Sequence, residues 1–479
     1  MVNINIDNIK SVYFVGAGGI GMSALVRYFL SKGKLVAGYD RTPSELTECL
    51  IAEGAQIHYE EDVHLIPEAC RDRENTLVVL TPAVPQEHEE LTYFRDNGFE
   101  IQKRAQVLGT ITYSSKGLCV AGTHGKTTTS SMLASTLDAM GFDPTFLIGG
   151  IVRAYGSNAH CGKGEYYVVE ADESDKSFTY LDPTSVLVTN IEADHLDHYS
   201  GLDEIYQLFG DFMGSVHEDG CCVVCGEDAG LVETAKKTGK KVLTYGFSEG
   251  CDTVVSQYET HGVSISFTVT LPDGTALPCS IKQNPGRHNA LNAAGVLTLL
   301  MTRGVDMQKA AEALSEFMGV RRRFDLVGEA DGVTILDDYA HHPTEIAATI
   351  AAAKELDFKR VCVVFQPHRY SRIRLFTEVL KDEFGKAFDQ ADMVTFLDVY
   401  PAGETPVPGV TGRTFMQPIY DNPNHPADLN YVDRRMQVVP FLTKTLQPGD
   451  LVITMGAGDV TSVGPELLAA LQEREKSRK

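Results

Sequence analysis

The chain has 479 residues, is 43% hydrophobic and 22% charged, and carries a formal net charge of -23. At roughly 150 residues per domain, this length predicts about three domains. The acidic balance argues against a surface for nucleic acid or anionic membranes, so any positive charge that binds phosphates must be local. The chain shows no signal-like start, no apolar run near the length of a membrane span and no disulfide-scaffold pattern among its 10 cysteines. We therefore expect a cytoplasmic protein with neither nucleic-acid nor membrane partners.

The first block begins with a strand, a glycine-rich turn and a helix. The strand and turn span 11–21, the helix 22–33 and a second strand 34–40, which together make a βαβ unit. Gly16, Gly18 and Gly21 match the G-x-G-x-x-G pattern, and Asp40 ends the second strand, where a dinucleotide site has an acidic residue. This pattern predicts that backbone N–H groups bind a diphosphate. Both NAD and another diphosphate ligand remain open.

A second phosphate loop follows a strand in residues 117–131. Only Thr123 and His124 separate Gly122 from Gly125, fewer residues than the usual P-loop has. The loop nevertheless follows an apolar strand and precedes a hydroxyl-rich helix, so Lys126 can neutralise phosphates and Thr127 can coordinate Mg²⁺. We expect ATP to be the ligand of this loop, which extends to Thr128.

Further metal ligands are expected at the carboxyl ends of the next strands. The strand at 165–172 delivers Glu170, and the strand at 185–195 delivers the polar residues Asn190, Glu192, Asp194 and His195. Glu170 and His195 lie nearest to the strand ends and are the metal candidates. The acids Asp172, Asp175 and Asp197 are expected to be helix caps or solvated loop charges.

Residues 221–225, "CCVVC", raise the alternatives of half a zinc site and a buried strand, and the missing second pair favours the strand. Alternating residues over 252–281 predict antiparallel hairpins with a turn at 272–274. A helix from 289 to 302 places Asn289 and Asn292 on one face, where two amides can read a base or ribose.

A third block begins near residue 319 and alternates again. Strands are predicted at 333–340, 360–368, 393–400 and 451–459, a helix at 344–356, and a frayed, solvated helix end at 471–479. One arginine of Arg321, Arg322 and Arg323 is expected to reach a γ-phosphate. Asp338, His341, Arg369 and Arg372 lie just past apolar strands, where a parallel sheet presents its ligand site. The two arginines and the histidine suit a small carboxylate and a developing oxyanion.

Seven segments occur in the order seen in the Mur ligases: "GTHGKTTT", "EADESD", "NIEADHLD", "GRHNALNA", "RRRFD", "DDYAHHPTE" and "FQPHRYSR". The chain resembles this family over nearly its whole length and is most similar to its alanine-adding members. The resemblance implies an α/β fold of three domains. These are a Rossmann-like UDP-sugar domain (1–116), a P-loop ATPase-like domain with a mainly parallel sheet and an antiparallel addition (117–320), and a Rossmann-like amino-acid domain (321–479).

The resemblance also implies an activity, in which ATP and Mg²⁺ drive the joining of L-alanine to the lactyl carboxylate of UDP-N-acetylmuramate through an acyl phosphate. The implied ligands of the UDP-sugar are Gly16, Gly18, Gly19 and Gly21, with Asp40 at the end of the second strand. Those of ATP are Gly122, Thr123, Gly125, Lys126, Thr127, Thr128, Asn289, Asn292, Arg323 and Asp338. Those of Mg²⁺ are Thr127, Glu170 and His195. Those of the amino acid are Tyr339, His341, Arg369 and Arg372. The implied catalytic residues are Lys126, His195, Arg323, His341, Arg369 and Arg372.

Two departures from the family pattern stand out. Residues 81–85, "TPAVP", stand where the family commonly has a serine-rich turn near the sugar nucleotide. Several sister ligases use a carbamylated lysine, but the segment between Lys176 and Lys236 contains no lysine that could serve in this way. A recycling ligase that adds a whole tripeptide stays open as the alternative, although "FQPHRYSR" favours alanine. An NAD-dependent oxidoreductase would explain only 16–40, and a silent nucleotide-binding regulator would not need Lys126, Glu170 and His195 together. Strict choice of L-alanine over glycine or serine, and a monomer or a homodimer, also stay open.

Overall fold

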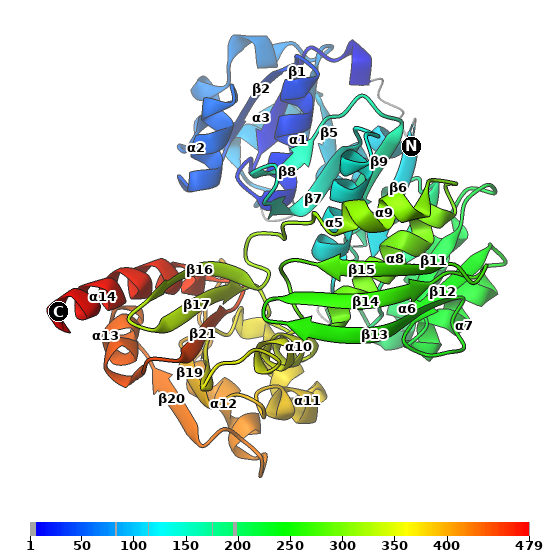
Figure 1. The fold of residues 1–479 in the computed structure, drawn as a ribbon. Helices are drawn as coiled ribbons and strands as arrows, with labels where there is room; N and C mark the ends of the chain where they lie inside the picture. Colours follow the sequence, from blue (N-terminus) through cyan, green and yellow to red (C-terminus); the bar gives the residue numbers. More distant parts are fainter. Residues whose placement is uncertain (1–5, 82–83, 114, 175, 195–198, 479) are drawn as a thin grey trace. The chain divides into compact units, whose positions relative to one another are not determined.

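The computed structural model describes residues 6–81, 84–113, 115–174, 176–194 and 199–478. The chain divides into two compact units (Figure 1). The first contains Met1–Val255, Val269–Leu277 and Asn292–Phe317, and the second contains Ser256–Thr268, Pro278–Leu291 and Met318–Lys479. Within the described residues, three β-sheets of five, ten and six strands form their frameworks. The predicted α/β fold of three domains is confirmed.

The first sheet has the strand order β3-β2-β1-β4-β5 and is parallel throughout. Its strands are β1 (Ser11–Val15), β2 (Leu35–Tyr39), β3 (Gln56–His58), β4 (Thr76–Leu80) and β5 (Glu100–Lys103). Its helices are α1 (Ile20–Ser31), α2 (Glu45–Ala52), α3 (Glu89–Asp96) and α4 (Arg104–Tyr113). All residues of β1 are buried, as expected for a parallel strand covered on both faces. The strand order reverses between β1 and β4, and open sheets of this kind bind ligands beyond the carboxyl ends at that point.

The second sheet is parallel in its centre, in the order β12-β11-β10-β6-β9-β7, with β8 antiparallel to β7 at one edge. The central strands are β6 (Lys116–Ala121), β7 (Thr145–Val152), β8 (Ser157–His160), β9 (Tyr166–Glu170), β10 (Ser185–Val188), β11 (Cys222–Cys225) and β12 (Val242–Gly246). The strands β13 (Thr253–His261), β14 (Ser264–Thr270) and β15 (Ala276–Ile281) follow at the other edge. β13 pairs parallel with β12. The short connections from β13 to β14 and from β14 to β15 make these three strands the antiparallel addition, because parallel strands need longer crossovers.

The helices of this part are α5 (Lys126–Ala139), α6 (Leu202–Gly214), α7 (Ala229–Lys237), α8 (Arg287–Met301) and α9 (Met307–Leu314). The cysteine-rich segment is the buried strand β11, as its apolar composition predicts. The helix predicted at 289–302 is α8, shifted by two residues at its start. The hairpin turn predicted at 272–274 connects β14 to β15, and Gly274 there has a φ of 86°.

The third sheet has the order β16-β17-β21-β18-β19-β20 and is parallel except for β16, which runs antiparallel to β17. Its strands are β16 (Asp325–Ala330), β17 (Val333–Asp338), β18 (Arg360–Phe365), β19 (Met393–Leu397), β20 (Asp428–Val432) and β21 (Asp450–Met455). Its helices are α10 (Pro343–Lys354), α11 (Lys381–Lys386), α12 (Gly412–Tyr420), α13 (Arg435–Thr445) and α14 (Val463–Arg478). Shorter helical turns lie at Ile6–Asn8, Val63–Leu65, Glu68–Arg71, Ser177–Tyr180, Tyr370–Arg372, Leu375–Val379 and Asp459–Ser462.

The end of the chain agrees with the prediction of a solvated helix end in part, since Gln472, Glu473, Lys476 and Ser477 are exposed, but it is not frayed. Helix α14 continues to Arg478, and Leu471 is fully buried in the core of the third sheet. The guanidinium of Arg474 donates to Asp331 at 2.5 Å and to the carbonyl oxygen of Leu446 at 3.1 Å. These contacts could not be predicted from the charged sequence of the tail, because each partner of Arg474 lies on a distant segment.

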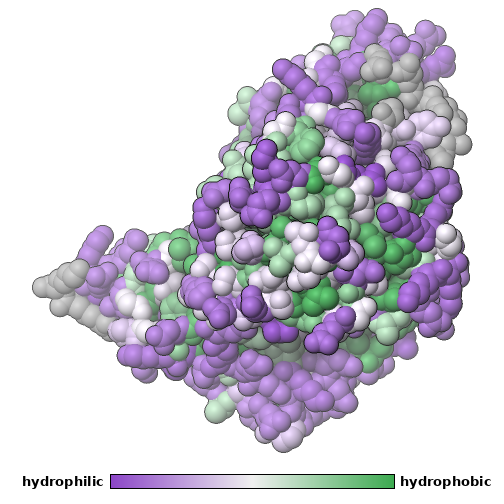
Figure 2. Space-filling view, turned by 45° about the vertical axis from the view of Figure 1, so that its right-hand side comes forward, coloured by the Kyte–Doolittle hydropathy of each residue, from purple (hydrophilic) through white to green (hydrophobic). Residues whose placement is uncertain are grey.

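Within the described residues, no helix combines the length and apolar character needed to cross a bilayer. Hydrophilic residues are spread over the face drawn in Figure 2.

Candidate active site

The glycine-rich turn of the first sheet lies between β1 and α1, as predicted. The N–H groups of Gly16 and Ala17 donate to the carbonyl oxygen of Tyr39, at 2.8 and 2.9 Å, which ties the turn to the end of β2. Gly19 is the N-cap of α1 and, having no side chain, caps none of the N–H groups at the start of the helix. The turn therefore presents the start of α1 at the carboxyl edge of the sheet, where a helix dipole favours an anion.

Asp40 follows β2 and bonds to this turn. Its Oδ2 accepts a hydrogen bond from the Gly18 N–H at 2.6 Å, and its Oδ1 accepts one from the Thr42 N–H at 3.3 Å. Asp40 thus shapes the turn that was predicted to contact the substrate. Of the unusual "TPAVP" segment, residues 82–83 lie outside the part of the chain that the structure describes.

The phosphate loop connects β6 to α5. Gly122 has a φ of 132°, and a Cβ atom there would lie 2.0 Å from the Thr189 hydroxyl oxygen. The Thr123 N–H donates to the Asn190 carbonyl oxygen at 3.0 Å, and the His124 N–H donates to the Asn190 side-chain oxygen at 2.9 Å. These contacts fold the loop against the end of β10, and they leave no room for a side chain at Gly122.

Lys126 is the first residue of α5 and points back across the loop. Its ammonium donates to the carbonyl oxygens of Gly122 at 2.6 Å and Thr123 at 3.1 Å, and it forms an ion pair with Glu173 at 2.8 Å. Burial acts to lower the pKa of Lys126, but the carboxylates led by Glu173 outweigh it, so the pKa is raised. Lys126 therefore keeps its charge in a buried position where a phosphate chain would meet it.

Thr127 and Glu170 lie together beside the loop, as predicted for metal ligands. The Thr127 hydroxyl donates to Glu170 Oε1 at 3.0 Å, and the Gly149 N–H donates to Glu170 Oε2 at 2.8 Å. A hydroxyl and a carboxylate oxygen beside a phosphate loop are the donors that Mg²⁺ prefers, so these two residues fit a Mg²⁺ ion. Thr128 is buried in the same first turn of α5.

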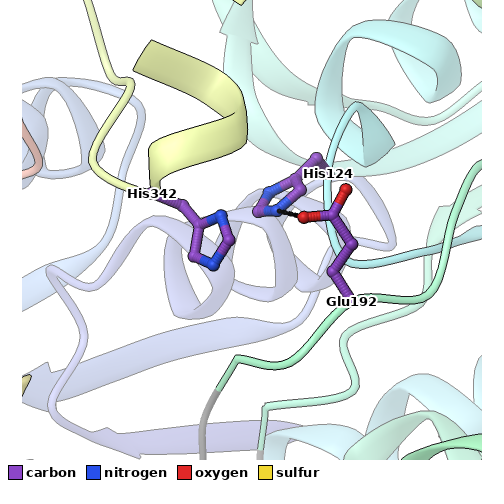
Figure 3. Close-up of side chains that lie close together, drawn as sticks. All are labelled: His124, Glu192 and His342. Atoms are coloured by element: carbon purple, nitrogen blue, oxygen red, sulfur yellow. Dashed lines mark ion pairs between the residues drawn. The ribbon is translucent and has the colours of Figure 1, made fainter. Parts of the chain in front are cut away.

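Two further side chains near the loop form an ion pair. His124 Nε2 lies 3.5 Å from Glu192 Oε2, and the pair is drawn in Figure 3. Glu192 also donates its backbone N–H to the Thr123 hydroxyl at 2.8 Å. The segment after β10 thus folds onto the phosphate loop. Asp194 is buried in the same segment, and the predicted metal ligand His195 lies outside the described residues, as do Asp175 and Asp197.

The two asparagines of α8 have different surroundings. In the first unit, the Asn292 side chain lies beside the phosphate loop, since a Cβ atom at Gly125 would be 3.2 Å from its Oδ1. In the second unit, the Asn289 amide nitrogen donates to the carbonyl oxygens of Asn284 at 3.2 Å and Pro285 at 3.0 Å. Both asparagines are buried.

In the second unit, the arginines of "RRRFD" surround an aromatic ring. The guanidinium carbons of Arg322 and Arg323 lie 4.9 and 5.1 Å from the centroid of the Tyr339 ring. Arg322 donates to Asp337 at 3.3 Å and to the Gly456 carbonyl oxygen at 2.7 Å, so it anchors strands β17 and β21. Arg323 has a longer contact with Glu345, at 3.9 Å.

Asp338 and His341 follow β17. Asp338 accepts hydrogen bonds from the N–H groups of Phe324 at 2.7 Å and Ala340 at 2.8 Å, and burial raises its pKa to about 6 against the opposing charge of Arg323. His341 Nδ1 lies 3.4 Å from a Glu345 carboxylate oxygen, and its ring meets the Tyr339 ring edge-on at 5.3 Å.

Arg369 and Arg372 follow β18, at the same carboxyl edge of the sheet. Arg369 has a φ of 68°, uncommon for a residue with a side chain, and its N–H donates to the Tyr400 carbonyl oxygen at 2.8 Å. Arg372 ends the short helical turn Tyr370–Arg372. The third sheet therefore brings these arginines to the edge that also carries His341, as predicted from the strand ends.

Sequence reasoning missed two residues that the structure places in these groups. Glu173 belongs to the quoted "EADESD" segment, but its ion pair with Lys126 spans 47 positions of sequence. The His368 ring stacks on the Tyr400 ring, with 5.8 Å between the ring centroids, and meets the His341 ring edge-on, with 6.2 Å between the centroids. Burial, aided by Arg372 and Arg369, lowers the pKa of His368 to about 4, so its ring is neutral at neutral pH. Its place inside "FQPHRYSR" was the available signal.

Three family models match consecutive parts of the chain. They are described as Mur ligase family, catalytic domain (residues 11–115), Mur ligase middle domain (residues 120–300) and Mur ligase, glutamate ligase domain (residues 322–458).

Relatives and solved structures match at full length. A UDP-N-acetylmuramate--L-alanine ligase of Phocaeicola vulgatus is 42% identical over 474 residues, which covers 98% of this chain and 100% of the relative. A ligase of the same name from Pelotomaculum thermopropionicum is 40% identical over 98% of this chain and 99% of its own. The crystal structure of the UDP-N-acetylmuramate-alanine ligase MurC from Thermotoga maritima gives a TM-score of 0.79 at 28% identity, over 98% of this chain and 100% of that one. A murein peptide ligase structure from Psychrobacter arcticus gives 0.71 at 23% identity, over 97% and 99%.

Proposed function

The chain belongs to the Mur ligase family, and we propose that it is an ATP-dependent ligase that joins L-alanine to the lactyl carboxylate of UDP-N-acetylmuramate. This reaction serves peptidoglycan precursor synthesis. The observation that carries the proposal is the phosphate loop, in which the charged ammonium of Lys126 lies buried beside the Thr127–Glu170 pair. The identity of 42% to a named alanine ligase over 98% of the chain supports the choice of reaction.

The proposal assigns one ligand to each of three domains, 1–116, 117–320 and 321–479. The first binds UDP-N-acetylmuramate on its glycine-rich turn, from Gly16 to Gly21, with Asp40 as the residue that shapes the turn. The second binds ATP on the loop from Gly122 to Thr128, with Asn292 beside it. The third supplies the amino-acid site. We place the protein in the cytoplasm, as a monomer or a homodimer.

Thr127 and Glu170 are the described residues that would hold Mg²⁺, and His195 is proposed as a further ligand on the basis of its motif. When bound, Mg²⁺ neutralises charge on the transferring phosphoryl group. The backbone contact from Gly149 orients the Glu170 carboxylate, which leaves its Oε1 side facing Thr127.

The chemistry joins two anions, so the protein must offset their repulsion. The lactyl carboxylate attacks the γ-phosphate of ATP, which gives an acyl phosphate and ADP. Lys126 serves this step with a positive charge that burial does not remove, because the carboxylates around it raise its pKa. Arg323 and the asparagines Asn289 and Asn292 are proposed as further ATP ligands, and Asp338 as a ligand of the ribose.

The amine of L-alanine then attacks the acyl carbon, an oxyanion forms, and phosphate leaves. Arg369 and Arg372 are the proposed partners of the amino-acid carboxylate and the oxyanion, since guanidinium groups match both in geometry. His341 and Tyr339, whose rings meet edge-on, are proposed to line the same amino-acid site.

The test is ADP release by purified protein with Mg²⁺-ATP and UDP-N-acetylmuramate. L-alanine, glycine, L-serine and the L-Ala-γ-D-Glu-diaminopimelate tripeptide are compared as acceptors. Preference for L-alanine is the expected result. Preference for the tripeptide would move the protein to the recycling ligases, and release that needs no acceptor would refute ligation.

A further inference from the structure

Arg104 lies against the glycine-rich turn of the first sheet. It is the first residue of α4 and follows β5 directly, so it begins at the same carboxyl edge of the parallel sheet as Gly16. A Cβ atom at Gly21 would lie 2.8 Å from Arg104 Nη1 and 3.2 Å from its Cζ. The guanidinium therefore packs closely against Gly21, and a side chain at this position would displace Arg104 from its place.

The same guanidinium is tied to the loop after β9. Arg104 Nη2 lies 3.3 Å from Asp172 Oδ2, and the two side chains are 21% and 36% exposed. Asp172 is expected from the sequence to be a cap or a solvated charge, and its Oδ1 does accept a hydrogen bond from the Ser174 N–H at 3.1 Å, while its Oδ2 pairs with this cation. Its neighbour Glu173 pairs with Lys126, so two adjacent acids hold the cations at the two phosphate-binding loops.

We propose that Arg104 is a substrate-binding residue that contacts the diphosphate of the nucleotide sugar, and that Asp172 holds it in place until the substrate binds. This inference rests on the proposed function, since it adds a residue to the substrate site of that reaction. No sequence motif assigned Arg104 a role.

Charge makes this assignment specific. The protein carries a net charge of -23, so a doubly charged diphosphate needs a local cation, and glycine N–H groups alone supply only partial charges. Arginine presents several donors in one plane and binds phosphate oxygens in pairs. The long contact of 3.3 Å to Asp172, in a partly exposed pair, is weak enough for a diphosphate to replace.

The test is direct titration of UDP, UMP and ADP into the full-length protein by calorimetry. Arg104→Met should weaken UDP binding by about 10- to 100-fold, which is the range for a hydrogen bond to a charged group, and UMP binding by much less. ADP affinity should stay within about twofold. Arg104→Lys, which keeps the charge but not the planar fork, should fall between the wild type and Arg104→Met.

Arg27 offers a matched control on the same domain. It pairs with Glu53 at 2.8 Å and donates to Asn158 of β8 at 2.5 Å, so it also ties the first sheet to the second, yet it lies inside α1 away from the turn. Arg27→Met should leave UDP affinity unchanged. If it weakens UDP binding as much as Arg104→Met does, Arg104 acts only through domain packing and the proposal fails.

A second variant tests the role of the acid. In Asp172→Asn, UDP should bind as tightly as in the wild type or up to about fivefold more tightly, because the competing charge is gone. Weaker UDP binding in this variant would overturn the proposal, as would an equal loss of UDP and UMP affinity in Arg104→Met.

Turnover separates this inference from the proposed function. Arg104→Met should raise the KM for UDP-N-acetylmuramate while the KM for ATP stays unchanged. If the wild type is inactive but binds UDP through Arg104, the proposed ligase activity is refuted and the role of Arg104 in UDP binding stands. An active wild type whose KM does not respond to Arg104→Met would keep the ligase and refute the residue.

Discussion

The buried carboxyl of Glu90, in α3, makes the stability of the first sheet depend on pH. Glu90 is fully buried, accepts a hydrogen bond from the Tyr13 hydroxyl at 2.6 Å and lies 3.6 Å from His58 Nε2. Burial raises the pKa of Glu90 from 4.5 to about 7, although the bond from Tyr13 opposes the rise. The neighbouring acids Glu61 and Asp62 add to it.

The raised pKa of Glu90 sets the direction of the pH dependence. Because the folded pKa lies above the unfolded one, the neutral carboxyl stabilises the fold fully below pH 4.5, and this stability is lost as the pH rises through 7. A pKa raised from 4.5 to about 7, at about 1.4 kcal/mol per pH unit, amounts to about 3.5 kcal/mol of unfolding free energy, of which about 2.5 kcal/mol is lost between about pH 5 and pH 8.

Glu90→Gln removes the titration and keeps an acceptor for Tyr13. The opening free energy of β1 is measured by hydrogen exchange at pH 5 and pH 8, with each rate corrected for its intrinsic pH dependence. The variant should gain about 2 to 3 kcal/mol relative to the wild type across this interval. Glu89→Gln, a change at the exposed neighbouring position, is the control and should gain nothing. Equal pH dependence in the wild type and Glu90→Gln would refute the reasoning.

Three substitutions test the proposed active site. Gly122→Ala should abolish measurable ADP binding in calorimetry, because the φ of 132° and the 2.0 Å approach to Thr189 exclude a methyl group. The control Gly141→Ala, at a φ of 84° and with no atom within 4 Å, should only lower the melting temperature. Retained ADP affinity in Gly122→Ala would contradict the loop geometry. Glu170→Gln should raise the Mg²⁺ concentration needed for half-maximal turnover by about tenfold or more, and an unchanged Mg²⁺ titration would remove Glu170 from the metal site. Arg369→Ala should lower kcat by about 100- to 1000-fold with ADP affinity nearly unchanged, and normal turnover would exclude it as an oxyanion donor.

Much of the fold could be predicted because its signals are local. The strand β6, with five of its six residues buried, and the turn at Gly33, with a φ of 70°, follow from apolar runs and glycine positions in short windows. The antiparallel strand β8, Ser157–His160, escaped prediction because its four residues carry little alternation of apolar and polar side chains. The anchored tail escaped it because Arg474 finds Asp331 across 143 positions.

The same difference between local signals and long-range contacts applies to the candidate site. Residues inside one motif, such as Lys126 and Thr127, could be placed at the phosphate loop from spacing, because the loop and the start of α5 are continuous in sequence. The partners Glu173 and Asp172 could not be matched to their cations, since the ion pair between Arg104 and Asp172 spans 68 positions and depends on how the first two sheets pack. His195, a motif-based metal ligand, stays a prediction.

The most direct test of the central claim is the mass of the product formed in competition. The protein is supplied with Mg²⁺-ATP, UDP-N-acetylmuramate and equal concentrations of L-alanine and the tripeptide, and the UDP-linked products are separated and weighed by mass spectrometry. We expect UDP-N-acetylmuramate enlarged by one alanine residue, formed in equal amount with ADP. A product enlarged by the tripeptide, or ADP without an enlarged product, would contradict it.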